Sequence, residues 1–452
     1  MTLRLCVAAA AAVLAAQGAP ARGPLRVLDS NPRYFTDGSG KAIFLTGSHM
    51  WWNFQDNGHR RQVSPPPVYD YEAYLNFLQS HGHNFFRLWR WEVPQWTDEK
   101  PPGVKRCRPH PWARTGAGAA ADGEPKFDLT RFDPEYFDRM RSRIAAARDR
   151  GIYVSIMLFE GWAAQQTDAW GFHPFQAANN ANGIDAGATG YYTLDDTAPG
   201  RRILELQEAY LRKVVDTVND LDNVLYEVVN ESGPFSLKWQ HHVVRFVKQY
   251  EAGKPKQHPV GITVPYPYGT NAMVFNSPAD WVSPNRGGSG ESYLDDPSDE
   301  YRGKVIVNDT DHLLGHTGGD AVWVWKSFCR GLNVLFMEEL TPSPTWQDSA
   351  RDAMGQARRY AEKIDLAGMT PRNRMASTGY CLANPGKEYV VFQPGSQGEF
   401  SVDLTAAAGT FAVEWLNVNT GMSQAGKPAE GGARRVFITP FGGPAVLYLK
   451  LR

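Results

Sequence analysis

Short apolar runs alternate with amphipathic stretches along the chain up to about residue 370. Brief runs rich in Val, Ile and Phe are typical of buried strands, whereas apolar residues spaced three and four apart indicate a helix that faces a core. One such helix is expected over 134–149, where Phe137, Met140 and Ile144 share a face. Strands that alternate with helices in this way predict βα units around a parallel sheet.

The alternation supplies enough strands for a closed barrel. A hairpin at 33–47 leads into the first strand. Later strands are expected at 84–91, 152–159, 224–229, 260–264, 281–283, 304–307 and 332–337, and helices at 69–80, 134–149, 203–218, 240–250, 319–330 and 349–363. Eight strands at this spacing predict an α/β fold of the (β/α)8 TIM-barrel type, whose active site lies at the C-terminal strand ends. A doubly wound sheet is the competing topology, but chemically rich residues follow nearly every strand rather than one crossover.

Beyond about residue 370 the pattern changes to short alternating strands without helices. These are expected at 389–392, 399–404, 410–417, 434–439 and 445–451, a run typical of a β-sandwich. We therefore predict a signal peptide over 1–21, a barrel domain over 22–370 and a small all-β sandwich over 371–452. Two long connections, at 95–126 and 163–200, follow strands and would overhang the barrel mouth.

The N-terminus has the pattern of an export signal. Arg4 precedes an apolar run over 5–16, and Ala19-Pro20-Ala21 offers a cleavage site of small residues. The apolar run is shorter than a membrane span, and no later segment reaches that length. We expect a secreted or periplasmic protein that has no membrane partner.

Composition narrows the class of ligand. The formal net charge of −1 argues against a nucleic-acid partner. The 14 Trp and 19 Tyr residues supply flat faces on which sugar C–H groups pack, although any single Trp could equally fill the core. Cys107, Cys329 and Cys381 have no metal-type spacing and allow at most one disulfide. We expect a monomer that uses neither a cofactor nor a metal.

The most specific motif closes the predicted fourth strand, where Asn230-Glu231-Ser232 follows an apolar run. Cleavage of a glycosidic bond needs a protonated carboxyl group that assists the leaving oxygen and an ionised carboxylate across the sugar ring. Glu231 is the candidate proton donor, and the amide of Asn230 could bond the sugar 2-hydroxyl. A Glu that caps the next helix is the alternative from spacing alone.

These residues and three further segments resemble clan A of the glycoside hydrolases, especially the cellulase-like family 5 and its apiosidase-like relatives. The further segments are 82–88, which contains Arg87, the Asp-Gly-Ser-Gly-Lys hairpin at 37–41, and the helix entry at 127–133. The resemblance covers about residues 25–370 and implies a glycosidase on a TIM barrel. The C-terminal module resembles a collagen-binding-type domain, a label that alone does not imply a collagenase.

In barrels of this clan the nucleophile follows the seventh strand, which here continues as Asn308-Asp309-Thr310-Asp311-His312. The clan pattern has a Glu at this point, and the chain departs from it. The resemblance therefore implies Asp309 as the first choice of nucleophile and Asp311 as the second. A helix N-cap and a cation site are the alternatives for this segment. If the strands are miscounted, Glu338 becomes the candidate.

Polar and aromatic residues at the strand ends and in the second long connection are the candidate substrate-binding residues. They are His49, Trp51, Trp52, Arg87, Trp89, Trp91, Glu160, Trp162, His173, Asn180, Asn230, His312 and Glu338. Arg87 could hold the nucleophile ionised, or it could form a structural ion pair with Glu92 or Glu160. Asn180 could recognise hydroxyl groups or belong to an Asn-rich turn.

The hypothesis is a secreted retaining hydrolase of a poly- or oligosaccharide that works by double displacement. Asp309 acts as nucleophile, and Glu231, which needs a raised pKa, acts first as acid and then as base. Two rival hypotheses retain the glycosidase fold but not the catalytic activity. One is an inactive carbohydrate-binding protein, and the other is a matrix-binding adhesive module.

Overall fold

The computed structural model describes residues 19–57, 65–99, 102–165, 167–285, 293–314, 319–395 and 398–452. The predicted signal peptide over 1–21 lies outside the described residues, apart from 19–21. Within the described ranges, no helix is both long enough and apolar enough to cross a membrane.

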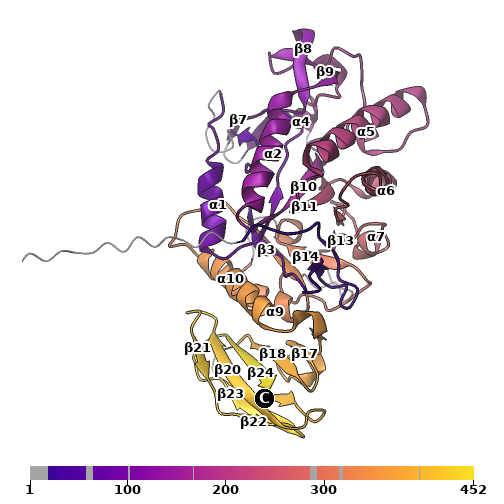
Figure 1. The fold of residues 1–452 in the computed structure, drawn as a ribbon. Helices are drawn as coiled ribbons and strands as arrows, with labels where there is room; N and C mark the ends of the chain where they lie inside the picture. Colours follow the sequence, from indigo (N-terminus) through magenta and orange to yellow (C-terminus); the bar gives the residue numbers. More distant parts are fainter. Residues whose placement is uncertain are drawn as a thin grey trace, which may run out of the picture.

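Eight parallel strands form the central sheet (Figure 1). They are β3 (Thr46–His49), β5 (Phe85–Leu88), β10 (Tyr153–Glu160), β11 (Val224–Asn230), β12 (Val260–Thr263), β13 (Trp281–Ser283), β14 (Val305–Asp309) and β15 (Asn333–Met337). Each strand pairs with the next along the chain from β5 to β15, and β15 pairs with β3. The predicted TIM barrel is confirmed as a nearly closed parallel barrel.

The seam between β3 and β5 is joined by Asn84. Its backbone N–H donates to the carbonyl of Thr46 (2.9 Å), and its side-chain oxygen accepts from the N–H of Thr46 (2.9 Å). The side-chain NH2 donates to the carbonyl of Phe44 (2.9 Å). A Cβ at Gly47 would lie 2.1 Å from the carbonyl oxygen of Phe85, so glycine permits this close approach of the two strands.

Helices follow most of the strands and cover the outside of the barrel (Figure 1). They are α1 (Tyr71–Ser80), α2 (Pro134–Arg148), α5 (Ala198–Val218), α6 (Leu237–Glu251), α7 (Asn271–Phe275), α9 (Ala321–Cys329) and α10 (Asp348–Lys363). The N-termini of α1, α2 and α9 are capped by the carboxylates of Asp70, Asp133 and Asp320.

The barrel interior is apolar toward the N-terminal ends of the strands. The apolar cluster there includes Leu45, Phe85, Tyr153, Leu225, Trp281, Val305, Val307 and Leu335. The Trp281 indole lies directly against Gly261, where a Cβ would come within 1.9 Å of the ring. Because side chains two positions apart in a strand share a face, the charged residues Arg87, Glu227 and Asp309 lie one layer above Phe85, Leu225 and Val307. The apolar layer thus supports a polar layer at the mouth.

The connection expected over 95–126 contains regular structure. It forms two antiparallel hairpins, β6 (Gln95–Glu99) with β7 (Pro102–Arg108), and β8 (Trp112–Ala119) with β9 (Pro125–Phe132). The strand β4 (Asp56–Asn57) adds to β7. Prolines and a run of Gly and Ala hide these strands from pattern analysis.

The second long connection contains several short helical turns ahead of α5. They are α3 (Trp162–Gln165), α4 (Thr167–Trp170), η1 (Ala177–Asn179) and η2 (Gly190–Tyr192). The N–H of Thr97 in β6 donates to Asp168 of α4 (2.8 Å), so the two connections touch each other.

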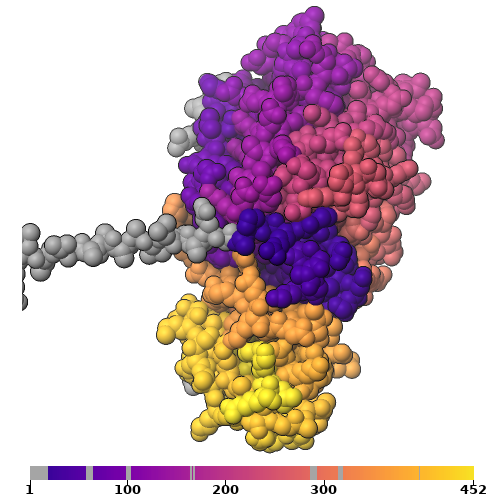
Figure 2. All heavy atoms as spheres, in the orientation of Figure 1, coloured from indigo at the N-terminus to yellow at the C-terminus, as the bar shows by residue number. Residues whose placement is uncertain are grey.

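The C-terminal region is a separate β-rich module below the barrel (Figures 1 and 2). One sheet contains β16 (Thr370–Pro371), β17 (Cys381–Asn384), β18 (Glu388–Gln393), β20 (Thr410–Asn417), β21 (Ser423–Ala425), β22 (Ala429–Glu430) and β24 (Ala445–Leu451). A second pairs β19 (Glu399–Asp403) with β23 (Arg434–Ile438).

The large C-terminal sheet packs on both of its faces. On one face Phe392 stacks on Trp325 of α9 (ring centroids 6.5 Å apart), and the hydroxyl of Tyr360 in α10 donates to Glu414 (2.8 Å). On the other face Trp415 contacts Phe400 of β19 (6.0 Å). The module is therefore joined to the barrel by a packed interface rather than by a linker alone.

The cysteines make no disulfide among the described residues. Cys107, Cys329 and Cys381 are all buried with free thiols. The short hairpin that precedes the barrel pairs β1 (Arg26–Val27) with β2 (Phe35–Thr36).

Candidate active site

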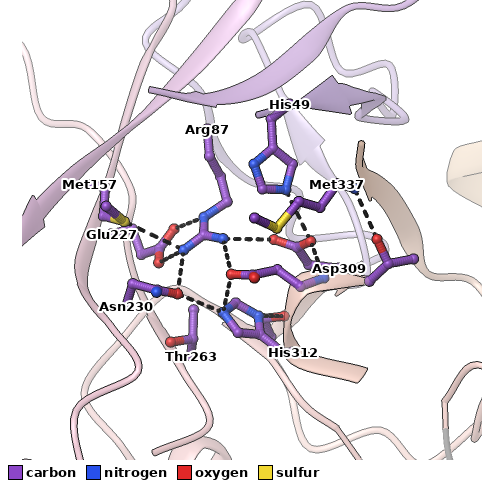
Figure 3. Close-up of polar contacts among 12 residues, drawn as sticks. His49, Arg87, Met157, Glu227, Asn230, Thr263, Asp309, His312 and Met337 are labelled. Atoms are coloured by element: carbon purple, nitrogen blue, oxygen red, sulfur yellow. Dashed lines mark hydrogen bonds and ion pairs between the residues drawn. The ribbon is translucent and has the colours of Figure 1, made fainter. Parts of the chain in front are cut away.

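Arg87 lies at the centre of the polar layer, buried at the end of β5 (Figure 3). Its Nε donates to Oε2 of Glu227 (2.7 Å) and its Nη2 to Oε1 of the same carboxylate (2.6 Å). Its Nη1 donates to Oδ2 of Asp311 (2.7 Å) and Oδ2 of Asp309 (3.2 Å). Nη2 also reaches Oδ1 of Asn230 (3.0 Å). One guanidinium thus holds three carboxylates and an amide from β11, β14 and the segment that follows β14.

Asp309 is held on both carboxylate oxygens. Oδ1 shares a hydrogen bond with Nε2 of His49 (3.1 Å) and accepts from the N–H of Asp311 (3.0 Å), while Oδ2 faces Arg87. Burial by itself raises the pKa of Asp309, but His49 and then Arg87 outweigh burial and hold the pKa well below its usual range. Asp309 is therefore ionised. Its contacts also hold the side chains of His49 and Arg87 in place.

Asp311 and His312 begin the short helix α8 (Asp311–Leu314). Asp311 bonds Arg87 through Oδ2, and no hydrogen bond reaches its Oδ1 from the residues that the structure describes. Nδ1 of His312 shares a hydrogen bond with the hydroxyl of Ser283 (2.8 Å), and Nε2 lies 3.4 Å from Oδ1 of Asn230. Burial lowers the pKa of His312, which favours the neutral imidazole.

The same segment has the residue types of a metal site. Ligand atoms of Asp309, Asp311 and His312 lie within 4.8 Å of one another. However, Nη1 of Arg87 already bonds both carboxylates. Its positive charge competes with a cation for the same oxygens, so the donor set fits an ion-pair network better than a metal.

Glu231 directly follows β11 and has a left-handed backbone, with φ 47°. A non-glycine residue in this region is strained, and such strain persists only where the surroundings impose it. Here the carbonyl of Glu231 accepts from Nε2 of Gln165 (2.5 Å), and the preceding carbonyl of Asn230 accepts from the N–H of Gly161 (2.6 Å). The segment that follows β10 thus holds the turn that presents Glu231.

The surroundings of the Glu231 carboxyl group favour its neutral, protonated form. Burial, and next the negative charge of Asp311, raise the pKa of Glu231 to about 8, although Arg87 opposes the shift. Among the residues that the structure describes, no hydrogen bond reaches its carboxyl group. At neutral pH this carboxyl group is therefore largely protonated, while Asp309 is charged.

The aromatic candidates divide into a buried and a partly exposed set. Trp89 and Trp91 are buried, and Trp91 stacks on Trp96 of β6 (4.4 Å). Trp51, Trp52 and Trp162 keep part of their surface exposed. The partly exposed rings can meet a ligand directly, whereas the buried ones support them.

A second buried network lies beside the first. Oε2 of Glu92 shares a hydrogen bond with Nε2 of His173 (2.8 Å), and its Oε1 accepts from the N–H of Glu160 (3.0 Å). Oε1 of Glu160 accepts from the N–H of Trp162 (2.6 Å). Asn180 donates to the carbonyls of 174, 176 and 184. These contacts order the second long connection, as the Asn-rich turn alternative expects.

Glu338 is placed apart from the Arg87 network. Its buried carboxylate accepts from Nε of Arg351 in α10 at 3.0 and 2.9 Å. The strand count also holds, because β14 is the seventh barrel strand and Glu338 follows the eighth. The strands were therefore not miscounted, and Glu338 does not become the nucleophile candidate.

Glu227 is the site residue that pattern analysis overlooked. It is the single charged residue inside the apolar run of β11 and is fully buried. A charged residue in a central strand is rare unless it is paired. The lone glutamate in this apolar run was therefore the sequence feature that could have identified Glu227 as a site residue.

Comparison with known proteins places this geometry in context. The family model described as "Apiosidase-like, catalytic domain" matches residues 29–186. A second, described as a domain of unknown function (DUF6298), matches residues 108–266. A search among curated proteins found no match.

Solved structures show the same architecture over nearly the whole chain. A glycoside hydrolase family 5 protein from Bacteroides vulgatus is 14% identical, with 95% of this chain and 93% of that chain covered and a TM-score of 0.61. Another structure, described as a glycoside hydrolase, is 13% identical, with 95% and 97% covered and a TM-score of 0.60. At such identities the likeness shows the fold, and together with the apiosidase-like catalytic match it supports a glycoside hydrolase.

Proposed function

We propose that the protein is a retaining glycoside hydrolase in which Glu231 is the acid/base and a seventh-strand aspartate is the nucleophile. The observation that carries the proposal is a carboxyl group with a raised pKa beside a carboxylate that Arg87 holds. Burial and the charge of Asp311 raise the pKa of Glu231 to about 8, and Asp311 accepts a hydrogen bond from Nη1 of Arg87 (2.7 Å). A protonated carboxyl group next to a carboxylate paired with a cation is the pattern of acid and nucleophile.

Asp311 is the better placed of the two aspartates. Asp309, the first choice from the sequence, has both oxygens occupied by His49, Arg87 and a backbone N–H. Asp311 keeps one oxygen available, and it is the carboxylate whose charge raises the pKa of Glu231. We therefore assign attack to Asp311 and assign Asp309 the role of positioning Arg87 and His49.

The reaction then runs in two displacements. Glu231 gives its proton to the glycosidic oxygen as the bond to the anomeric carbon breaks, and a carboxylate oxygen of Asp311 bonds that carbon. Once the leaving group departs, ionised Glu231 takes a proton from water. The water oxygen attacks the anomeric carbon and releases Asp311.

The charge balance of the polar layer suits this reaction. Glu227, Asp309 and Asp311 share one guanidinium, so the layer has a net negative charge when all three are ionised. An oxocarbenium-like transition state carries positive charge on the sugar ring, and a preorganised negative site stabilises it.

The substrate class we propose is a glycoside of apiose, which follows from the apiosidase-like catalytic match over 29–186. The natural substrate is then a poly- or oligosaccharide that bears this sugar. We also propose export through the 1–21 signal, because a plant or microbial polysaccharide is met outside the cell.

A screen with stereochemical readout tests the proposal. Aryl glycosides, including an apioside, and plant and bacterial polysaccharides are incubated with the protein, and the first-formed product anomer is followed by NMR. Cleavage with retention is expected. Inversion would contradict double displacement, and no cleavage by a folded protein would contradict the hydrolase.

A further inference from the structure

Two tyrosines stand out from the surface at the C-terminal end of the barrel. Tyr266 is 54% exposed and Tyr268 is 90% exposed, in the connection that follows β12. Large aromatic side chains bury about 150–250 Å² when they are packed. Leaving these two rings exposed therefore gives up a large favourable free energy of burial. Within the part of the chain that the structure describes, neither ring stacks on another aromatic ring and neither hydroxyl makes a hydrogen bond.

The backbone of this connection is fixed in a tight turn. The N–H of Gly269 donates to the carbonyl of Pro265 (2.8 Å), and a Cβ at Gly269 would lie 2.1 Å from that same oxygen. Tyr268 has φ 73°, a left-handed conformation that is unfavourable for an aromatic residue. A strained, hydrogen-bonded turn that projects two rings outward is preorganised for contact with a ligand.

The turn is tied directly to the proton donor. Nε2 of Gln165 donates both to the carbonyl of Glu231 (2.5 Å) and to the carbonyl of Tyr266 (3.2 Å). One side chain thus sets the spacing between the acid and the tyrosine turn. The Arg87 network joins strands β5, β11 and β14, whereas the tyrosine turn belongs to β12.

We propose that Tyr266 and Tyr268 form an aromatic platform for the sugar residues of the leaving group. This inference rests on the proposed function, because the proton of Glu231 must go to the oxygen that joins the leaving group to the cleaved sugar. The leaving group therefore extends from that oxygen past Glu231, on the side where the tyrosine turn lies. Sugar C–H faces pack on such rings, so the enzyme selects substrates whose leaving group is itself a saccharide.

Affinity electrophoresis tests binding without requiring turnover. The wild type, Tyr266→Ala, Tyr268→Ala and Tyr268→Phe are run in gels that contain apiose-bearing pectin, homogalacturonan or carboxymethylcellulose. We expect at least one polysaccharide to retard the wild type and Tyr268→Phe, and the two alanine variants to lose about three- to tenfold in affinity. Equal retardation of all four proteins, or none of the wild type in any gel, overturns the platform.

Kinetics separate the platform from catalysis. A glycosyl fluoride places no sugar in the leaving-group site, so the alanine variants should turn it over like the wild type while losing kcat/KM on an oligosaccharide. Equal loss on both substrates overturns the assignment. Ile438→Ala is the matched control, since it removes a side chain that is 63% exposed on the C-terminal module. If the wild type is retarded and the alanine variants are not, but nothing is cleaved, the proposed function and the leaving-group assignment are refuted, and the tyrosines are shown to bind sugar only.

Discussion

Arg87 and Glu227 form a bidentate ion pair in the barrel interior, with Nε–Oε2 and Nη2–Oε1 distances of 2.7 and 2.6 Å. Both side chains are fully buried. The pair leaves Nη1 available to hold Asp309 and Asp311, so Glu227 sets the orientation of the guanidinium that binds them. Through Arg87, Glu227 thereby controls the geometry of both aspartates.

Glu227→Gln should therefore affect stability and activity together. Removing one partner of a buried pair costs about 3 kcal/mol, because the remaining charge loses compensation. We expect the free energy of unfolding to fall by about that amount in urea titrations, and kcat to fall because Arg87 is no longer fixed.

The matched control is Glu135→Gln, which breaks an ion pair with Arg139 in which the glutamate is 64% exposed. Such exposed pairs contribute about 0.5 kcal/mol or less. Similar losses in the two variants would refute the structural role assigned to Glu227.

The pH dependence of kcat should report Glu231. The acid works only when protonated, so activity is present below its pKa and is lost as pH rises through about 8. On a substrate with a sugar leaving group, Glu231→Gln should lose roughly 10²–10⁴-fold in kcat, and the residual activity should show no fall near pH 8. An alkaline fall that persists unchanged in Glu231→Gln would assign that titration to another group.

The same raised pKa predicts a cost in stability. The unfolded chain releases this proton near pH 4.5, the ordinary value, whereas the folded chain keeps it until about pH 8. The folded state binds more protons across that window, so its stability falls as pH rises from 4.5 to 8. Glu231→Gln removes the penalty and should raise Tm more at pH 8 than at pH 5. An equal change in Tm at both pH values would argue against the buried, raised carboxyl group.

The barrel and the position of Glu231 at the end of a strand were predictable from sequence because both leave local signals. Apolar runs mark the buried strands, and Asn230-Glu231 interrupts such a run at its end. The hairpins at 95–132 were not predictable, since their strands are small-residue or proline-containing and gain their order from pairing. Ion pairs between residues distant in sequence could not be predicted either. Glu338 meets Arg351 only because α10 packs against β3, which pairs with β15, and Glu227 meets Arg87 only across the intervening strand β10.

Gly261→Ala should destabilise the barrel without altering the polar layer. The added Cβ would come within 1.9 Å of the Trp281 indole, which fills the apolar layer beneath the site. Overpacking of this kind costs about 1–3 kcal/mol, measurable as a lower Tm. Gly190→Ala is the control, because its Cβ would meet nothing within 4 Å. A Tm for Gly261→Ala equal to that of the control would show that the indole can move aside.

Chemical rescue should decide which aspartate is the nucleophile. Asp311→Gly removes the carboxylate that we assign to attack, so kcat should collapse, and azide should occupy the vacated space and attack the anomeric carbon. The expected product is a glycosyl azide of inverted anomeric configuration, detected by NMR. Asp309→Gly should also lose activity, because His49 and Arg87 lose their shared partner, but azide should not restore it. Rescue of Asp309→Gly alone would reverse the assignment.

Asp311→Asn gives an independent check. Loss of its charge should lower the pKa of Glu231 and move the alkaline fall in residual activity to lower pH.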